Sequence, residues 1–286
     1  MTKQIHPSTQ IGLVKIKISD LKRSVAFYTE VVGLRILSQT ENIAELTVDG
    51  KQPLLILEQI ENAVILPERT VAGLYHFAIL VPDRVSLGLS LRNLIKFNIG
   101  VGQGDHLVSE ALYINDPDNN GIEIYADRPK ETWKHGADGE VVMATDPVDI
   151  DGLLAISEGK TWSGLSEDTI MGHVHFHVSD LQKTEAFYCG ILGFDVTAHY
   201  GSMALFISAG GYHHHIGLNT WAGVGAPPAP HDAVGLDYFT LVLPNHEELD
   251  NVIVQLKDAG ISVKYIDGGW FVKDPSNITI KLLSQG

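Results

Sequence analysis

Cysteine, positive charge and long apolar runs are all scarce in this chain. The one cysteine, Cys189, excludes an intramolecular disulfide and suits a reducing compartment. Only 20 lysines and arginines stand against 35 aspartates and glutamates, and the formal net charge of -15 disfavours binding to nucleic acid or to a membrane surface. No apolar run approaches the ~20 residues of a membrane span, and the segment MTKQIHPSTQ lacks the apolar core of a signal peptide. We therefore expect a cytoplasmic protein that binds a small molecule.

An internal repeat organises the rest of the sequence. The segments 18–34, ISDLKRSVAFYTEVVGL, and 178–194, VSDLQKTEAFYCGILGF, share seven of seventeen residues at an offset of 160. In both copies an aspartate after an apolar run, Asp20 or Asp180, predicts the start of a helix. A glycine such as Gly33 predicts its end.

Two weaker copies of the repeat begin with GLYHFAILVPD at residue 73 and with GLDYFTLVLPN at residue 235. Helices are expected near 87–98 and 247–259, and short strand-like runs follow the helices. The chain thus divides into two halves, 8–128 and 171–286, joined by an acidic connector at 129–170. The halves hold four predicted βαβββ modules, at 11–60, 72–128, 171–221 and 234–284.

A single βαβββ unit leaves its sheet half-buried, so we expect the modules to pair and to close a curved sheet around a cavity. This pattern resembles the vicinal oxygen chelate superfamily, which includes glyoxalases and extradiol ring-cleaving dioxygenases. The resemblance covers nearly the whole chain outside the connector and is closest to the Bacillus-type catechol 2,3-dioxygenases. It implies an α+β fold of four βαβββ modules paired into two curved-sheet cups, with metal ligands on the first and last strands of paired modules.

The repeat locates the ligand positions that this resemblance implies. Counting back seven residues from Asp20, Asp83, Asp180 and Asn245 gives Leu13, His76, His173 and Tyr238. On the last strands, Glu123 in NGIEIY is expected to correspond to Leu55 in the first module and to Lys281 in the fourth. His76, Glu123 and His173 are therefore the expected metal ligands. Such a set leaves open positions on Fe(II), or alternatively on Mn(II), for a substrate and dioxygen.

The segment 104–123, GDHLVSEALYINDPDNNGIE, resembles the extradiol dioxygenase signature. The matching residues are Gly104, His106, Leu112, Tyr113, Asp116, Pro117 and Glu123. Asn119 departs from the signature, which has glycine or proline there. The resemblance implies that Tyr113 hydrogen-bonds a substrate hydroxyl and that His106 lines the edge of the pocket. From the residues alone, Tyr113 could equally be a strand aromatic, and His106 an exposed turn residue.

Three consecutive histidines, His213 to His215, interrupt an apolar stretch of the third module. Superposing ALFISAGGYHHHIGL on ALYINDPDNNGIEIY without gaps places Ile216 opposite Glu123, so the third module should contribute no carboxylate. Because strand side chains alternate, His214 is expected on the inner face with Ile216, and its two neighbours on the other face. The extradiol resemblance implies the same residue, since the second histidine of its His-His string is the catalytic acid/base.

The ligand positions favour one pairing of the modules over the other. If the second module pairs with the third and the first with the fourth, the two histidines and Glu123 share one cup. The alternative pairing separates them. The expected activity is metal-dependent extradiol cleavage of a small aromatic diol with O2. A glyoxalase-like lyase or isomerase, and a non-enzymatic protein that binds metal or an aromatic ligand, stay open as alternatives. The sequence also leaves open which substituents the aromatic ring carries and whether the protein is a homo-oligomer.

Overall fold

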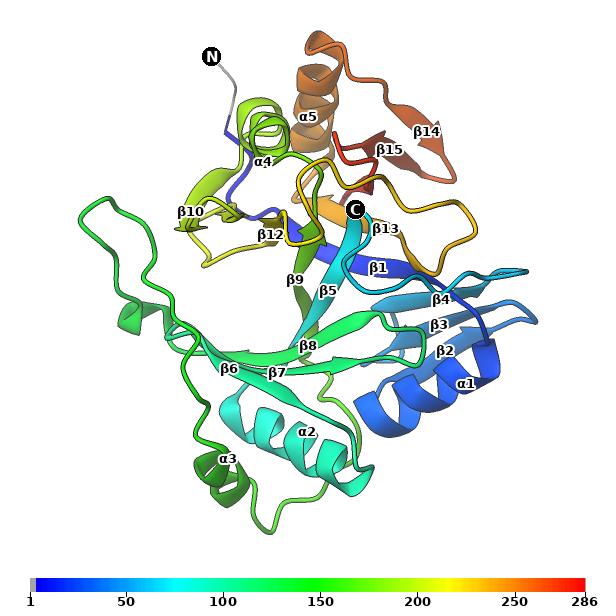
Figure 1. Ribbon diagram of the computed structural model, residues 1–286, viewed down its shortest axis with the longest axis vertical. Coiled ribbons are helices and arrows are strands. Elements are labelled where there is room, and N and C mark those ends of the chain that lie inside the picture. The colour runs from blue at the N-terminus through cyan, green and yellow to red at the C-terminus, as the bar shows by residue number, and fades with distance from the viewer. Residues whose placement is uncertain (1–3, 286) are drawn as a thin grey trace.

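The computed structural model describes residues 4–285 and contains two eight-stranded sheets (Figure 1). One sheet has the strand order β14-β15-β16-β13-β1-β4-β3-β2, and the other has the order β10-β11-β12-β9-β5-β8-β7-β6. The first and fourth modules therefore share one sheet, while the second and third share the other. This is the pairing that the ligand positions favoured, and it is confirmed by the strand order.

The first half of the chain supplies two repeats of strand, helix and three strands. The first repeat consists of β1 (Gln10–Ile18), α1 (Leu21–Ala26) with the π-helical turn η1 (Phe27–Val32), β2 (Arg35–Gln39), β3 (Ile43–Thr47) and β4 (Leu55–Gln59). The second consists of β5 (Gly73–Leu80), α2 (Arg84–Lys96), β6 (Gly102–Asp105), β7 (Ser109–Asn115) and β8 (Gly121–Asp127). The segment after β8 holds the short helices η2 (Lys130–Thr132) and α3 (Ile150–Ile156).

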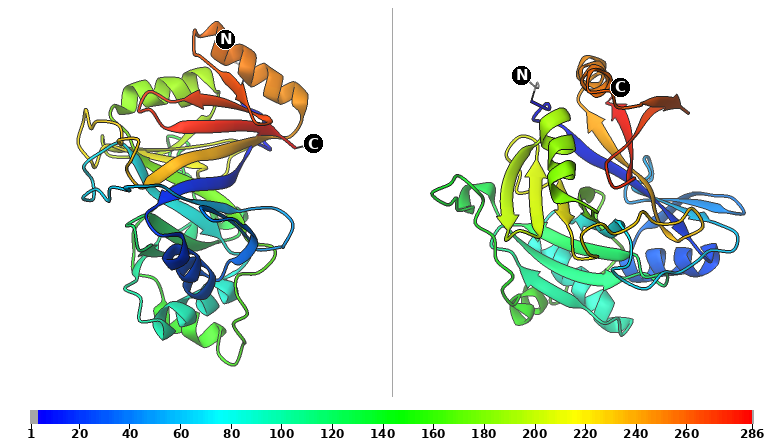
Figure 2. Two further views of the ribbon diagram at one scale, coloured as in Figure 1. Left: turned by 90° about the vertical axis from the view of Figure 1, so that its right-hand side faces the viewer. Right: turned by 45° about the horizontal axis from the view of Figure 1, so that its top comes forward.

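The second half repeats the pattern. Its first repeat consists of β9 (Ile170–His177), α4 (Leu181–Glu185) with the π-helical turn η3 (Ala186–Ile191), β10 (Asp195–Tyr200), β11 (Ala204–Ser208) and β12 (Ile216–Asn219). Its last repeat consists of β13 (Gly235–Leu243), α5 (His246–Asp258), β14 (Lys264–Ile266), β15 (Gly269–Lys273) and β16 (Thr279–Ser284). The long helices pack on strands of their own repeats, as Figure 2 shows for α5.

The predicted helix starts are N-caps in the structure. Each cap residue has an extended backbone and a side chain that accepts a hydrogen bond from the backbone N–H three residues later. The four residues are Asp20, Asp83, Asp180 and Asn245. Gly33 ends the first helical segment with φ 96, a left-handed conformation that favours glycine. The count of seven residues back from each cap therefore starts from equivalent points in all four repeats.

Buried side chains also join repeats that are consecutive in the chain but lie in different sheets. Tyr28 Oη donates to Asp116 Oδ2 over 2.9 Å, between the first and second repeats. Tyr188 Oη donates to Asp274 Oδ2 over 3.4 Å, between the third and fourth. Each aspartate sits in the turn before the last strand of its repeat. The two sheets are thus cross-linked by one equivalent pair in each half of the chain.

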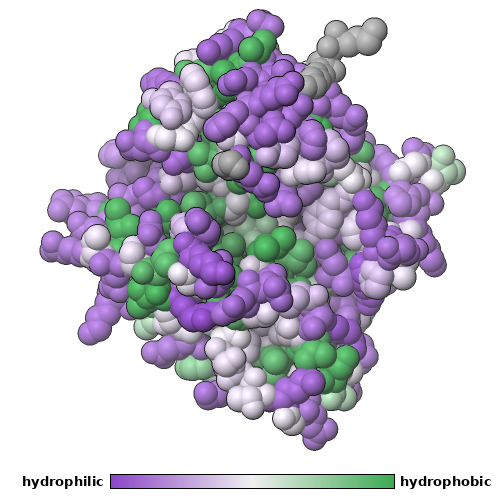
Figure 3. All heavy atoms as spheres, turned by 180° about the vertical axis from the view of Figure 1, so that it is seen from behind, coloured by the Kyte–Doolittle hydropathy of each residue, from purple (hydrophilic) through white to green (hydrophobic). Residues whose placement is uncertain are grey.

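The face shown in Figure 3 is mostly hydrophilic, and hydrophobic residues gather near its middle. Between residues 4 and 285, none of the helices is both long enough and apolar enough to cross a membrane.

Candidate metal centre

Three neighbouring strands bring His76, Glu123 and His173 together. His76 lies on β5, which is flanked by β8 with Glu123 and by β9 with His173. The Nε2 atom of His76 and the Nε2 atom of His173 are each 3.1 Å from Oε2 of Glu123. All three potential ligand atoms lie within 4.8 Å of one another, and all three side chains are buried. Ligand bonds of ~2 Å could therefore reach a common ion after a small adjustment.

The electrostatics of this cluster suit a divalent cation. Burial alone would raise the pKa of the Glu123 carboxyl, but His173 and His76 together hold it well below its usual value. Burial lowers the pKa of His173 to about 4, against the attraction of Glu123. At neutral pH the group is a buried carboxylate beside a neutral imidazole, which is the form that binds metals. Although it lies 3.1 Å from Glu123 Oε2, His76 Nε2 makes no hydrogen bond within the described residues, and a metal ion would give this buried nitrogen a partner.

Tyr113 and His106 lie beside Glu123. Tyr113 on β7 is directly opposite Glu123 on β8. His106 Nδ1 is 2.7 Å from the carbonyl oxygen of Ala144, which can only accept, so Nδ1 carries the proton. Its Nε2 therefore accepts from Tyr113 Oη over 2.6 Å. Burial, with a contribution from Glu123, raises the pKa of Tyr113 well above its usual value, so this hydroxyl stays protonated.

The gapless superposition of the third module on the second is wrong by one residue. Glu123 pairs with Ala78, two residues after His76, whereas the residue that pairs with His175, two residues after His173, is Gly217. Ile216 is instead buried in the hydrophobic core. The reason is one additional residue in the turn between β11 and β12, compared with the turn between β7 and β8. The same register places Ile56, and not Leu55, at the corresponding position of the first module.

The alternation argument for His214 also fails, because the three histidines precede β12 and lie in its leading turn. His214 nevertheless lines the cavity, and its ring centroid is 4.1 Å from that of His173. His213 is fully buried, and His215 accepts the backbone N–H of Ala209 at its Nδ1 over 3.2 Å. Burial, reinforced by the surrounding histidines, lowers the pKa of His214 well below its usual value.

A hydrogen-bonded chain runs from His214 to Asp127 at the end of β8. His213 Nε2 is 2.9 Å from Asp127 Oδ1, and His213 Nδ1 is 2.8 Å from His214 Nδ1. The ionised carboxylate accepts, so Nε2 of His213 donates and its Nδ1 accepts from His214 Nδ1. This leaves the lone pair of His214 on Nε2. Sequence reasoning missed Asp127, although Glu123 and Asp127, four residues apart on β8, share one face by strand alternation.

A cavity of about 470 Å³ lies over this cluster. His76, Tyr113, Glu123, His214 and His106 line it together with His175. One wall comes from residues 136–145 of the segment between the two halves. His177 does not line this cavity. It lines a neighbouring cavity of about 280 Å³, and Tyr75 borders both.

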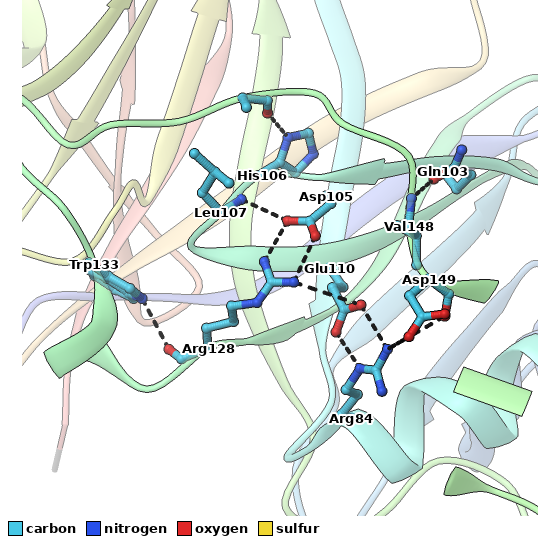
Figure 4. A network of polar contacts seen from close by, with 11 residues as sticks. Arg84, Gln103, Asp105, His106, Leu107, Glu110, Arg128, Trp133, Val148 and Asp149 are labelled. Carbon is cyan, nitrogen blue, oxygen red and sulfur yellow. Dashed lines mark hydrogen bonds and ion pairs between the residues drawn. The ribbon is translucent and has the colours of Figure 1, made fainter. Parts of the chain in front are cut away.

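Charged and polar contacts fasten this segment to the second repeat (Figure 4). The backbones of Asp105 and Asp146 exchange two hydrogen bonds of 2.8 Å and 2.9 Å. Arg84 binds Glu110 at 2.6 Å through its Nε atom and Asp149 at 3.3 Å through Nη2. The predicted connector therefore forms a wall of the cavity along residues 136–145 and is fastened to the second repeat at Asp146 and Asp149.

Comparisons with known proteins agree with this geometry. The chain is 56% identical to a catechol-2,3-dioxygenase of Bacillus subtilis (strain 168) over 272 residues, which cover 95% of each chain. In fold it is similar to the crystal structure of a putative dioxygenase from Bacillus subtilis (TM-score 0.66, 14% identity, 99% of this chain and 86% of that one). It is also similar to glyoxalase I from Zea mays (TM-score 0.54, 15% identity, 96% and 92%). The family model of the Glyoxalase/Bleomycin resistance protein/Dioxygenase superfamily matches residues 10–124 and 170–282, and the chain belongs to that superfamily.

Proposed function

We propose that the protein is a metal-dependent extradiol dioxygenase that opens the ring of a catechol-like diol with O2. The observation that carries the proposal is the convergence of His76, Glu123 and His173 beside a cavity, whose lining includes His76, Glu123, Tyr113 and His214. The identity with a catechol-2,3-dioxygenase over 95% of both chains supports the same reaction.

His76, Glu123 and His173 would hold the metal, for which we propose Fe(II), with Mn(II) as the alternative. The bound ion would supply adjacent positions for the two diol oxygens and for O2, and would pass electron density between them. The protein fixes the geometry around the ion. Because two histidines and one carboxylate occupy only part of an octahedral shell, this donor set suits such chemistry.

The other site residues would act on protons and on orientation. Tyr113 Oη, which gives its one proton to His106 Nε2, would accept a hydrogen bond from a hydroxyl of the bound diol. His214, whose lone pair is on Nε2, would accept a proton from a diol hydroxyl and return it when the O–O bond breaks. Both oxygen atoms of O2 then enter the product, in which the carbon–carbon bond beside the diol is broken.

A glyoxalase-like lyase or isomerase is the second candidate, and one observation counts against it. Such a site uses a second carboxylate or glutamine from the partner module, and the position that corresponds to Glu123 in the third module is Gly217. A protein that only binds metal or an aromatic ligand would have no need for a hydrogen-bonded acid/base chain behind His214.

Loading with Fe(II) without oxygen, followed by catechol and O2, tests the proposal. We expect O2 uptake, a yellow ring-fission product and about one iron per chain. Glu123→Ala should lose both iron and activity, whereas Glu45→Ala, on β3 of the other sheet, should lose neither. Metal binding without O2 uptake for any diol would reject the dioxygenase. The cytoplasmic location and a homo-oligomeric state remain proposals that fractionation and size-exclusion chromatography can test.

A further inference from the structure

The cavity wall away from the ligand set is apolar. The connector contributes Val141, Val142 and Met143, while Ala198 on β10 and Phe206 on β11 continue this surface. Phe206 occupies in the third repeat the position that Tyr113 occupies in the second, since each is paired with the equivalent residue of the next strand. Of these two equivalent positions, Tyr113 therefore presents a hydroxyl to the cavity, whereas Phe206 presents an aromatic ring without a polar group.

The charged residues that line the cavity are acidic. Besides Glu123, the wall contains Asp138 and Glu140 from the connector, and none of the lining residues in the described chain is a lysine or an arginine. His199 also lines the cavity, but its Nδ1 lies 2.5 Å from Glu140 Oε1 and its backbone N–H donates to Glu140 Oε2 over 3.0 Å. Away from the metal ligands, an anionic ring substituent would therefore meet carboxylates and no lysine or arginine of the cavity wall.

The cations that precede the lining segment in the chain do not line the cavity: Lys134 is exposed, and Arg128 and Lys130 bind other groups. Arg128 forms a two-pronged ion pair with Asp105 and lines a separate polar cavity. Lys130 Nζ donates to the carbonyl oxygen of Gly210 over 3.2 Å. Neither side chain is available to bind a carboxylate inside the metal cavity.

The size of the cavity adds a second constraint. A volume of about 470 Å³ lies within the range of roughly 300–1,000 Å³ that holds drug-sized ligands. A bare dihydroxybenzene is much smaller, so a ring placed at the metal ligands leaves space beside the apolar wall.

We infer that the site selects uncharged catechols that carry an apolar ring substituent, and that it discriminates against catechols whose substituent ends in a carboxylate. This inference rests on the proposed function, because it assumes that the diol binds at the ligand set. The apolar wall takes the substituent, and the acidic connector repels an anion.

A matched pair of ligands tests the inference without turnover. The Fe(II)-loaded protein is dialysed against catechol, 4-ethylcatechol or 3,4-dihydroxyphenylacetate in the absence of O2, and the Kd of each is measured. Burying one methylene favours binding by about fourfold, so 4-ethylcatechol should bind roughly tenfold more tightly than catechol. The acetate, which has a chain of equal length, should bind at least about tenfold more weakly than 4-ethylcatechol.

Two variants test the role of the wall. Val142→Lys places a cation at a lining position that is 38% exposed, and should raise the ratio of acetate affinity to 4-ethylcatechol affinity by about fivefold, because the new ion pair stays partly solvated. Glu140→Gln should raise the same ratio. Val254→Lys, at an exposed position of α5 outside the cavity, is the matched control and should leave the ratio unchanged.

Equal or tighter binding of the acetate by the unmodified protein would overturn the inference, and so would a ratio that both cavity variants leave unchanged. The two levels of the hypothesis fail differently. If the binding order holds but no diol consumes O2, the selectivity stands and the dioxygenase activity is rejected. If all three diols are cleaved with equal kcat/KM and bind equally, the activity stands and the selectivity is rejected.

Discussion

The imidazole of His213 bonds to the carboxylate of Asp127 across 2.9 Å, and this contact joins the turn before β12 to the end of β8. It fixes which nitrogen of His213 is protonated and, through His213, which nitrogen of His214 keeps its lone pair. Residues from both halves of the chain thus determine the protonation pattern of the proposed acid/base.

Asp127→Asn should disturb that pattern. An amide can donate to His213 Nε2, and the reversed chain would place the proton of His214 on the wrong nitrogen. We expect kcat to fall by about 10- to 100-fold, while KM and bound iron stay within about twofold. Tyr212→Phe is the control, because it removes the 2.9 Å bond to the other carboxylate oxygen and the 2.7 Å contact with Tyr125 Oη but leaves the bond between Asp127 and His213 intact. An unchanged kcat in Asp127→Asn would mean that His214 needs no such positioning.

Tyr113→Phe should weaken the enzyme without emptying the metal centre. The variant removes the hydroxyl that faces the proposed diol site and that donates to His106. A hydrogen bond between neutral groups is worth about 0.5–1.5 kcal/mol, so kcat/KM should fall by roughly 2- to 10-fold. Iron content, measured on the same samples, should not change. Loss of iron together with activity would instead assign Tyr113 to the support of the ligands.

Metal binding should stabilise the fold through Glu123. Metal at a hundred times its Kd stabilises the folded protein by about 2.7 kcal/mol, and this gain should appear as a higher Tm with Mn(II), which avoids oxidation during heating. Glu123→Gln should show no such shift. Without metal, the variant should melt below the Tm of the unmodified protein, because the fold holds the pKa of Glu123 well below its usual value and therefore stabilises the carboxylate at neutral pH. If Mn(II) raised the Tm of Glu123→Gln as much as that of the unmodified protein, the ion would bind at another site.

Asp274 should make stability depend on pH at a point remote from the metal centre. Burial raises its pKa from 3.8 to about 6, against hydrogen bonds from Ser276, Ile278 and Tyr188. The folded state therefore favours the protonated form, so the stabilisation is present below pH 4 and is lost as the pH rises to about 6. Relative to the unmodified protein, Asp274→Asn should gain up to about 3 kcal/mol between those values.

Urea unfolding of both proteins at a series of pH values measures that difference directly. Activity should be unaffected, because Asp274 lies in the turn between β15 and β16 of the other sheet. Asp250→Asn, at an exposed position of α5, should follow the unmodified protein at every pH. If the stability of Asp274→Asn has the same pH dependence as that of the unmodified protein, the carboxyl of Asp274 is not neutral in the folded state.

Much of the architecture could be predicted because the features that define the repeat depend on residues close together in the sequence. Helix caps such as Asp83 and Asp180 depend on a few neighbouring residues, and counting from them located His76 and His173 on adjacent strands. Local signals also favoured the pairing of the second and third modules, since only that pairing brings Glu123 to both histidines.

The misplaced features depend on distant contacts or on loop length. One additional residue in the turn before β12 shifts Gly217 into the position assigned to Ile216, and no periodicity reveals an insertion in a turn. The partnership of Asp127 with His213 spans 86 positions, so it becomes visible only when β8 and β12 are assembled around β5 and β9. The acidic wall at Glu140 likewise depends on where the connector crosses the cavity.

The division of each sheet between the two halves of the chain has a consequence for assembly. Residues 10–127 carry four strands of each sheet, and residues 170–284 carry the other four, so neither half alone can complete a sheet. His173 arrives with the second half, whereas His76 and Glu123 belong to the first. If the chain were cut within 157–168 and the pieces expressed separately, neither should bind iron tightly, and mixing them should restore binding. The amount of bound iron would then measure how much of the two fragments, each of which carries half of both sheets, has assembled.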